Sequence, residues 1–429
     1  MKRIAACLAS TLLLGGLAYA VPIERASVND EGVEGNRVSE PGSVADGGLL
    51  IAFTTLASNL VPGDFDDGLE VAYSIMRDRA AATTRWLVPP ALRSRSITFP
   101  VLTRGGGFAV FLSRQSNLVQ GDTMAQDVFR LEFGTGDIER VNQRPAFGNS
   151  AGEANARPSI SSGGRFVAFD SSAGDLVAGD TNGVVDVFVR DMSNASIERV
   201  SIGSTGTQAQ GTNNHPSISG DGRYVSFVSN ATEVGLPATA RAHVFVRDRL
   251  EGTTSRISVG LDGALPNGSS SLAQHAPISD NGRFVLFGSE ASNLVFSDSN
   301  GSADVFLFDR TDNSTVRIST GLDGTQLTLS TDGYSMSADA SRIVYLLRGP
   351  GGDRMVLLDR ASGRRIVVNR LGENGALGRP VFPSMSADGD FVIVRSPDSI
   401  LQQPSDDNED VFLFDLRDIL ETLFRDGFE

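Results

Sequence analysis

The sequence predicts an all-β fold, a seven-bladed β-propeller made of four-stranded antiparallel blades. The first observation is self-similarity, because aligned points recur along the chain with spacings of 58, 58, 58, 60, 59 and 48 residues. Those points are Leu49, Gly107, Arg165, Arg223, Arg283, Arg342 and Asp390. The second observation is that each repeat holds four short β-like segments. The third is that the last repeat lacks a fourth segment, whereas the chain begins with one.

The third repeat shows its four segments most clearly. Residues 159–161 come first, and a turn at 162–164 follows whose glycines tolerate the positive φ of tight hairpins. Residues 165–170 are apolar on both faces, which is typical of a strand buried on two sides. Residues 187–189 form a third apolar segment. Residues 197–201 alternate in polarity, as an outer strand does.

The two ends of the chain together supply one complete blade. Residues 23–27 (IERAS) match the outer segment 197–201 (IERVS), and the last repeat stops after its third segment at 410–415. We therefore expect the N-terminal strand to complete the last blade, which removes an exposed sheet edge. A linear β-solenoid and independent terminal strands are the alternatives. Solenoid rungs are shorter and need no closing device.

The first 20 residues predict export. Lys2 and Arg3 precede an apolar run over 4–17 and the small residues of 18–20, which together make a secretory signal peptide cleaved after Ala20. The expected boundaries are a signal peptide over 1–20, the propeller over 21–417 and a tail over 418–429. The mature chain then has no cysteine, because Cys7 is the only one. We expect a monomer without a transmembrane anchor, located in the periplasm or outside the cell.

Residues 415–429 differ from the repeats. Their apolar positions have helical spacing, which predicts a short amphipathic helix against the rim of the propeller. The closing sequence Asp-Gly-Phe-Glu resembles a short tail found on exported proteins of some Gram-negative bacteria. Simple packing is the alternative interpretation of this ending.

Net charge excludes one class of partner. The formal charge is −15, and removal of the signal peptide takes away the only lysine, Lys2, together with Arg3. A nucleic-acid surface needs clustered Lys and Arg, whereas here one or two arginines of each repeat recur at turn positions. An acidic chain is compatible with divalent cations, with cationic partners or with plain solubility.

The repeat motif resembles a known class of exported proteins. The pattern is Ser-Ile-Ser, then Asp-Gly-Arg-Tyr/Phe-Val-Ser/Ala-Phe, then Asp-Val-Phe-Val-Arg-Asp, as in residues 216–227 and 186–191. It resembles the TolB-type, WD-repeat-like β-propeller repeats of bacteria and covers nearly all of the mature chain. The resemblance implies a propeller that binds or scaffolds in the cell envelope or outside. TolB itself has a further N-terminal domain and fewer blades, so its partners are not carried over.

Acidic and amide side chains recur in the loop before the third segment of several repeats. They are Asp64, Asp66 and Glu70, then Asp180, Asn182 and Asp186, and then Asp298, Asn300 and Asp304, with partial sets at Asp122 and Asp127 and at Asp406, Asn408 and Asp410. Hard oxygen ligands at alternating loop positions suit structural Ca²⁺. The alternative is turn chemistry, since Asx residues before a tight turn bond to their own backbone. The fourth and sixth repeats lack the set.

A second set of candidates lies eight residues before each alignment point, where the innermost strand should begin. The residues there are Pro41, Phe99, Arg157, His215, His275, Tyr334 and Phe382. We expect Arg157, His215, His275 and Tyr334 to form an arc at one mouth of the central channel, which makes them the ligand-binding candidates. The alternative is that they are loop residues beside proline.

These observations favour a binding or scaffolding module for a protein or glycan partner. No Gly-x-Ser-x-Gly elbow opens a helix, no His-Glu-x-x-His motif occurs, and the chain has only three histidines. The alternative is a polysaccharide lyase or glycosidase that works from the central funnel, in which the arc residues would act on the sugar. No nucleophile and base can be paired from the sequence, so we predict no catalytic residue and no required cofactor.

Overall fold

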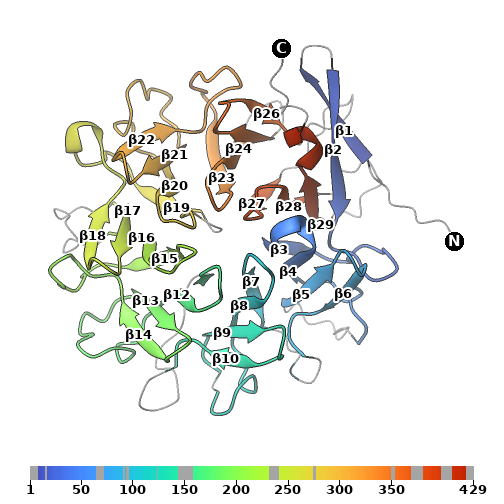
Figure 1. The fold of residues 1–429 in the computed structure, drawn as a ribbon, viewed down its shortest axis with the longest axis horizontal. Coiled ribbons are helices and arrows are strands. Elements are labelled where there is room, and N and C mark those ends of the chain that lie inside the picture. Colours follow the sequence, from blue (N-terminus) through green and yellow to red (C-terminus); the bar gives the residue numbers. More distant parts are fainter. Residues whose placement is uncertain are drawn as a thin grey trace. The chain divides into compact units, whose positions relative to one another are not determined.

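The structure is a computed structural model that describes residues 8–14, 17–63, 72–89, 92, 96–122, 124–143, 158–230, 241–273, 277–348, 353–368, 380–397 and 408–421, with side chains from residue 21 onward except that of residue 332. It contains seven four-stranded antiparallel blades, so the predicted seven-bladed β-propeller is confirmed (Figure 1). The chain divides into two compact units, Val88–Ile318 and Met1–Leu87 with Ser319–Glu429.

The unit Val88–Ile318 holds blades 2 to 5. Blade 2 consists of β7 (Thr98–Leu102), β8 (Phe108–Ser113), β9 (Asp127–Glu132) and β10 (Ile138–Arg140). Blade 3 consists of β11 (Ser159–Ile160), β12 (Phe166–Ser171), β13 (Asp186–Asp191) and β14 (Ser196–Arg199). Blade 4 consists of β15 (Asn213–Ile218), β16 (Tyr224–Ser229), β17 (His243–Asp248) and β18 (Thr253–Arg256). After the short helix η3 (Leu261–Gly263), blade 5 consists of β19 (Ser270–Leu272), β20 (Phe284–Ser289), β21 (Asp304–Asp309) and β22 (Ser314–Arg317).

The other unit holds blades 1, 6 and 7. Blade 1 consists of β3 (Ser39–Val44), β4 (Leu50–Thr55), β5 (Tyr73–Asp78) and β6 (Thr83–Trp86), with the short helix η1 (Asp46–Gly48) between its first two strands. Blade 6 consists of β23 (Ser330–Met336), β24 (Arg342–Arg348), β25 (Arg354–Asp359) and β26 (Arg365–Val367). Blade 7 consists of β27 (Val381–Met385), β28 (Phe391–Pro397), β29 (Glu409–Asp415) and β2 (Leu17–Arg25), and β1 (Leu8–Leu14) pairs with β2 outside it.

The N-terminal strand completes the last blade, as predicted. In β2, Ile23 pairs with Phe414 and Arg25 with Phe412 of β29. The Ser27 hydroxyl donates to an oxygen of Asp410 at 2.5 Å and accepts from the backbone N–H of Val411 at 3.1 Å. The pairing uses only residues 23–25, so it does not depend on the segment 1–20. Export and cleavage after Ala20 stay predictions.

The two middle strands of a blade are buried because both of their faces are apolar. In blade 3, Phe169 pairs with Phe188 across the sheet, and their rings stack with centroids 5.7 Å apart. Blades 2, 4 and 5 repeat this phenylalanine pair at 5.7 to 5.8 Å. Paired aromatic rings that are fully removed from water dominate the stability of such a core.

Neighbouring blades meet through a repeated joint of a glycine, an aromatic ring and an arginine. Gly222 of blade 4 has φ +77°, and the ring of Phe166 from blade 3 lies over it, so that a Cβ there would come within 2.2 Å of Phe166. Arg249 stacks on the same ring at 4.6 Å and donates to the carbonyl of Gly222. The joint recurs at Gly164 with Phe108, Gly282 with Tyr224 and Gly48 with Phe391.

The structure describes one turn of the helix that the sequence predicts after the last strand. Helix α1 (Arg417–Leu420) follows β29 directly, and Ile419 and Leu420 are buried against the core of blades 6 and 7. The Asp-Gly-Phe-Glu ending lies outside the described residues. Within the described ranges, no helix is long and apolar enough to cross a membrane.

Candidate functional site

Each blade has two ends with different chemistry. We call the turn end the one with the tight hairpins, which in blade 3 are the turns between β11 and β12 and between β13 and β14. The loop end carries the longer connections, which are the loop between the second and third strands and the link from the outer strand to the next blade. Because the four strands of a blade are antiparallel, these connections lie together at one end of that blade.

At the turn end, hydrogen bonds hold the inner hairpins to one another. Among blades 2 to 5, the carbonyl of Asp280 accepts from Gly220 N–H at 2.9 Å, and its carboxylate accepts from the Ser162 hydroxyl at 3.2 Å. Arg104 of blade 2 reaches the same carboxylate at 3.2 Å. The inner turns of four blades therefore converge on one residue.

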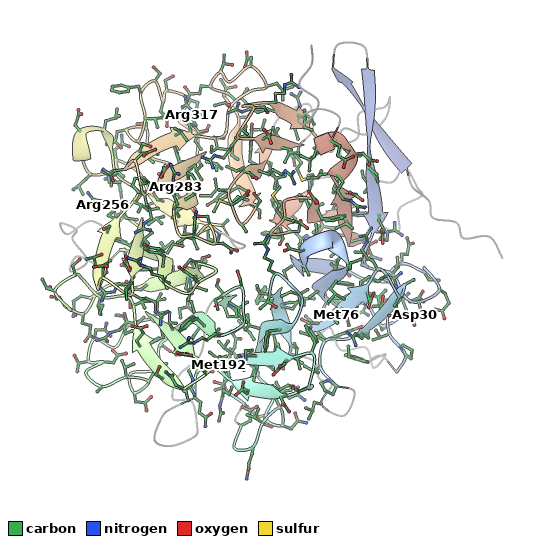
Figure 2. All side chains as sticks on the ribbon, in the orientation of Figure 1. Asp30, Met76, Met192, Arg256, Arg283 and Arg317 are labelled. Carbon is green, nitrogen blue, oxygen red and sulfur yellow. The ribbon has the colours of Figure 1, made fainter. Side chains whose placement is uncertain are left out.

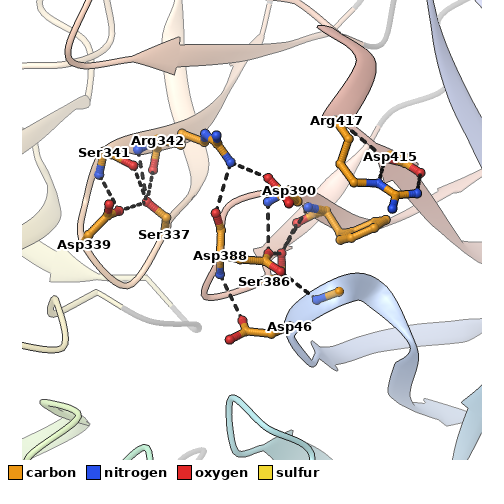
Figure 3. A network of polar contacts seen from close by, with 12 residues as sticks. Asp46, Ser337, Asp339, Ser341, Arg342, Ser386, Asp388, Asp390, Asp415 and Arg417 are labelled. Carbon is orange, nitrogen blue, oxygen red and sulfur yellow. Dashed lines mark hydrogen bonds and ion pairs between the residues drawn. The ribbon is translucent and has the colours of Figure 1, made fainter. Parts of the chain in front are cut away.

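Blades 6, 7 and 1 have a similar network, which Figure 3 shows from close by. Arg342 donates to the carbonyl of Asp388 at 3.0 Å and to the carboxylate of Asp390 at 2.5 Å. Asp388 in turn accepts from Gly47 N–H at 2.6 Å, and its own N–H donates to Asp46 at 3.0 Å. The polar groups of the turn end thus connect neighbouring blades.

Among the described residues, the innermost strand contains a bulge at the loop end in five blades. Register shifts interrupt the pairing at Pro41/Ser43, Thr98/Val101, Asn214/Ser217, Thr331/Tyr334 and Val381/Ser384. In three of these bulges a large side chain has a left-handed backbone, since φ is +55° at Phe99, +54° at His215 and +52° at Phe382. Bulky residues rarely adopt this conformation, and it turns the side chain out of the ladder.

The predicted arc is only partly covered by the described residues. His215 is exposed at the loop end of blade 4, with its Nδ1 atom 2.8 Å from the Asn214 carboxamide oxygen. Arg157 and His275 lie outside the described residues. Tyr334 is 6% exposed and therefore belongs to the core of its blade.

The sequence alignment places blade 6 one residue away from its true match to the other blades. Ser337 N–H donates to the carbonyl of Arg342, as Ser219 N–H does to that of Tyr224. Arg342 therefore corresponds to Tyr224 rather than to Arg223. The position that matches His215 is then Gly333, and Tyr334 is the next residue along the strand.

Blade 7 places an aromatic ring and a charged cluster at its loop end. The guanidinium of Arg395 lies 5.2 Å from the Phe382 ring centroid. The same arginine pairs with Glu409 at 3.0 Å and with Glu40 of blade 1. Phe382 is half-buried beneath this cation, which fixes the position of its ring.

The acidic loops contain an arginine between their carboxylates. In blade 3, Arg199 of β14 lies 3.0 Å from Asp180 and 3.5 Å from Asp186, and the Asn182 amide donates to Asp186 at 2.9 Å. In blade 2, Arg140 lies 3.2 Å from Asp122 and 3.6 Å from Asp127. We call this arrangement the ion cluster.

Blade 5 repeats the ion cluster with Arg317 of β22, which is labelled in Figure 2. Arg317 lies 3.4 Å from Asp298 and 3.8 Å from Asp304. These arginines occupy the space between the oxygens that the sequence offers to calcium, so a Ca²⁺ ion would compete with a guanidinium. Among the described residues, no three His, Cys, Asp or Glu side chains are gathered as a metal centre requires. Asp64, Asp66, Glu70 and Asp406 lie outside the described residues, and calcium binding stays a prediction.

Blade 4 replaces the carboxylate of the ion cluster by histidine. His243 begins β17 where other blades have Asp186 or Asp304, and it is fully buried. Burial, followed by the charges of Arg256 and Arg241, lowers the pKa of His243 from 6.5 to about 4. Figure 2 labels Arg256, on the outer strand of the blade.

This histidine gives blade 4 a pH dependence. Because the pKa of His243 is lower in the folded state than the ordinary 6.5 of an unfolded chain, its contribution to stability is complete above pH 6.5 and falls as the pH drops toward 4. We expect the wild type to lose on the order of 1 kcal/mol more than His243→Gln between pH 7.5 and pH 5. Urea denaturation at both pH values measures this, and equal losses would contradict it.

Comparison with known proteins identifies the fold and nothing narrower. No protein-family model and no curated protein matches the sequence. Among solved structures, an oligogalacturonate lyase in complex with manganese is 11% identical over 92% of this chain and 93% of that one, with a TM-score of 0.59. The β-propeller domain of the Trilobed protease from Pyrococcus furiosus is 8% identical over 88% of this chain and 96% of that one, with a TM-score of 0.55.

TolB from Acinetobacter baumannii is also similar, with 16% identity over 68% of this chain and 58% of that one and a TM-score of 0.40. The fold of the chain is that of a β-propeller. Identities this low describe the shared fold, and activity has to be argued from the chain's own residues.

Proposed function

We propose that this chain is an exported binding module that holds a protein or glycan partner at its loop end. The turn end is occupied by contacts between blades, whereas the loop end carries the bulges and the side chains that vary from blade to blade. Binding at a face of the propeller also needs no catalytic group. The proposal therefore agrees with a sequence in which no nucleophile and base can be paired.

The single observation that supports the proposal best is the left-handed backbone at Phe99, His215 and Phe382. Each such residue costs about 1–3 kcal/mol, and strain of this kind is found mainly where a side chain must be presented for function. Glycine at these positions would form the same bulge without strain. Phe99 is 36% exposed and His215 is exposed, so both rings are accessible to a ligand.

The chemistry of the partner follows from these groups and from the charge. Aromatic rings present large rigid surfaces that stack on sugar faces or pack against the side chains of a protein. A chain with a net charge of −15 repels polyanions at long range. A neutral or cationic partner fits both features.

Removal of these rings tests the proposal. We expect Phe99→Ala and His215→Ala, combined in one variant, to lower capture of the partner from an envelope extract at least tenfold, because exposed aromatic contacts dominate binding energy. The melting temperature should not fall. A glycan array and mass spectrometry of the captured proteins distinguish the two classes of partner.

The matched control is Leu250→Ala, since Leu250 is 72% exposed but lies in the turn between β17 and β18, at the turn end. It should capture as well as the wild type. Undiminished capture by the double variant, or an equal loss in the control, would refute a site at the loop end.

The second candidate function is a polysaccharide lyase. It is supported by the similarity in fold to an oligogalacturonate lyase. Release of unsaturated sugars from a polyuronate would establish it. Loss of that release in His215→Ala would place the reaction at the loop end.

A further inference from the structure

Blade 6 contains a pocket of about 400 Å³ at its loop end. Its walls are the link from blade 5 and the ends of three strands of blade 6. The lining residues that matter here are Thr320, Leu322, Leu347, Arg354, Val356 and Val367. The hydroxyl of Tyr345 donates to the carbonyl of Thr320 at 2.8 Å and fixes the link to the blade, so the pocket is preformed.

The pocket lies where other blades have the ion cluster. In blade 3, Ser171 pairs with Asp186 and Phe188 with Arg199 across the sheet. In blade 6 the same pairs in register are Leu347 with Arg354 and Val356 with Val367. Valine thus replaces both the phenylalanine and the arginine that fill this space elsewhere.

Blade 1 also has other residues in place of the ion cluster, but their side chains fill the space that the cluster occupies in blade 3. Its residues at the positions of Asp186 and Arg199 are Tyr73 and Trp86, whose rings lie 4.8 Å apart. Ile75 takes the position of Phe188 and pairs with Trp86. Two aromatic rings therefore close the gap in blade 1. Blade 6 has small aliphatic side chains and leaves it open.

Two polar groups at this pocket, the Thr320 hydroxyl and the Arg354 guanidinium, are available to a ligand. The hydroxyl of Thr320, a residue only 6% exposed, has no hydrogen-bond partner among the described residues. A buried hydroxyl without a partner costs about 1–3 kcal/mol, which a ligand would recover. Arg354 is exposed, and no carboxylate of the described part of the chain pairs with it. Asp323, also at the pocket, is engaged by the N–H and hydroxyl of Thr325.

We propose that this pocket binds an aliphatic carboxylate. The chain of the ligand lies among the leucine and valine side chains, and its carboxylate is held by Arg354 and the Thr320 hydroxyl. The named residues include no aromatic ring on which a sugar could stack. The charge of Arg354 selects an anionic head group over a neutral or cationic one.

A chain-length series tests the proposal. Titration calorimetry with hexanoate, octanoate and decanoate should show affinity rising roughly fourfold for each added methylene, because each buried CH₂ contributes about 0.8 kcal/mol. Decanol and decylammonium should bind at least tenfold more weakly than decanoate. Equal affinity for the three head groups would overturn the assignment to a carboxylate. A peptide ending in leucine that binds more tightly than decanoate would overturn the assignment to an aliphatic acid.

Three variants locate the site. Arg354→Gln should weaken decanoate at least tenfold, and Thr320→Val should weaken it about fivefold, which corresponds to one hydrogen bond. Val356→Phe restores the ring of the other blades and should abolish binding by filling the pocket. Arg364→Gln, in the turn at the other end of blade 6, is the matched control and should bind as the wild type does. If Val356→Phe fails to fold, unchanged binding in Arg354→Gln alone still overturns the proposal.

Discussion

Replacement of Gly222 by alanine is expected to lower the free energy of unfolding by about 3 kcal/mol. Two costs add at this position. The backbone has φ +77°, which costs a residue with a Cβ about 1–3 kcal/mol. The new Cβ would also lie 2.2 Å from the Phe166 ring of the neighbouring blade, and overpacking of this kind costs about 1–3 kcal/mol.

The control for this substitution is Gly206→Ala. Gly206 has φ +81°, but no atom lies within 4 Å of the Cβ that alanine would add, so only the backbone cost of about 1 kcal/mol remains. Urea denaturation measures both variants. Equal losses would show that the ring of Phe166 does not press on Gly222. In a double variant that combines Gly222→Ala with Phe166→Leu, the smaller side chain should restore part of the free energy of unfolding that Gly222→Ala loses.

Replacement of Arg140 by methionine is expected to cost about 3–5 kcal/mol at pH 7. The side chain of Arg140 is 1% exposed, and those of Asp122 and Asp127 are both 0% exposed. Methionine fills much of the space but leaves two carboxylates buried beside each other without a cation. The same loss of a partner at the surface is worth 1 kcal/mol or less.

Arg104→Met is the matched control, because Arg104 lies 3.2 Å from Asp280 with both side chains about two-fifths exposed. The triple variant Arg140→Met, Asp122→Asn and Asp127→Asn should recover much of the stability, since no buried charge remains. Thermal melts of the wild type, Arg140→Met, Arg104→Met and the triple variant measure these differences in stability. A loss in Arg140→Met no larger than that in Arg104→Met would contradict the ion cluster as a structural element.

The fold could be predicted because the repeats carry the information many times over. The closing strand, for example, follows from the match of 23–27 to 197–201, and the pairing of Ile23 with Phe414 bears it out. The residue that closes each tight turn is also visible in the sequence. The glycine, ring and arginine of the joint come from two blades, so they could be recognised only once the blades were placed side by side.

The candidate site was harder to predict, because its residues are the ones that differ from repeat to repeat. Counting back a fixed number of residues located His215, but it misplaced the corresponding residue of blade 6, where Gly333 rather than Tyr334 holds that position. Arg199 lies in the segment 197–201, which the sequence shows only as an outer strand of alternating polarity. Its long side chain instead reaches Asp180 in the loop, a contact that strand periodicity does not encode.

The pocket of blade 6 shows the same limit. Val356 and Val367 look like ordinary strand residues when the sequence is considered alone. Their role in the pocket is visible only from the strand register, in which they pair with each other at the positions of Phe188 and Arg199 in blade 3. A loss of side-chain volume in two strands becomes a cavity only if no neighbour moves in to fill it.

Site-specific photo-cross-linking tests the central claim, that the loop end is the binding face, most directly. A photoreactive residue placed at His215, or at Phe99 in a second protein, reports what touches the loop end in a native extract, and the same residue at Leu250 reports on the turn end. We predict covalent adducts of one partner at His215 and Phe99 and none at Leu250. Adducts at Leu250 alone would contradict the account.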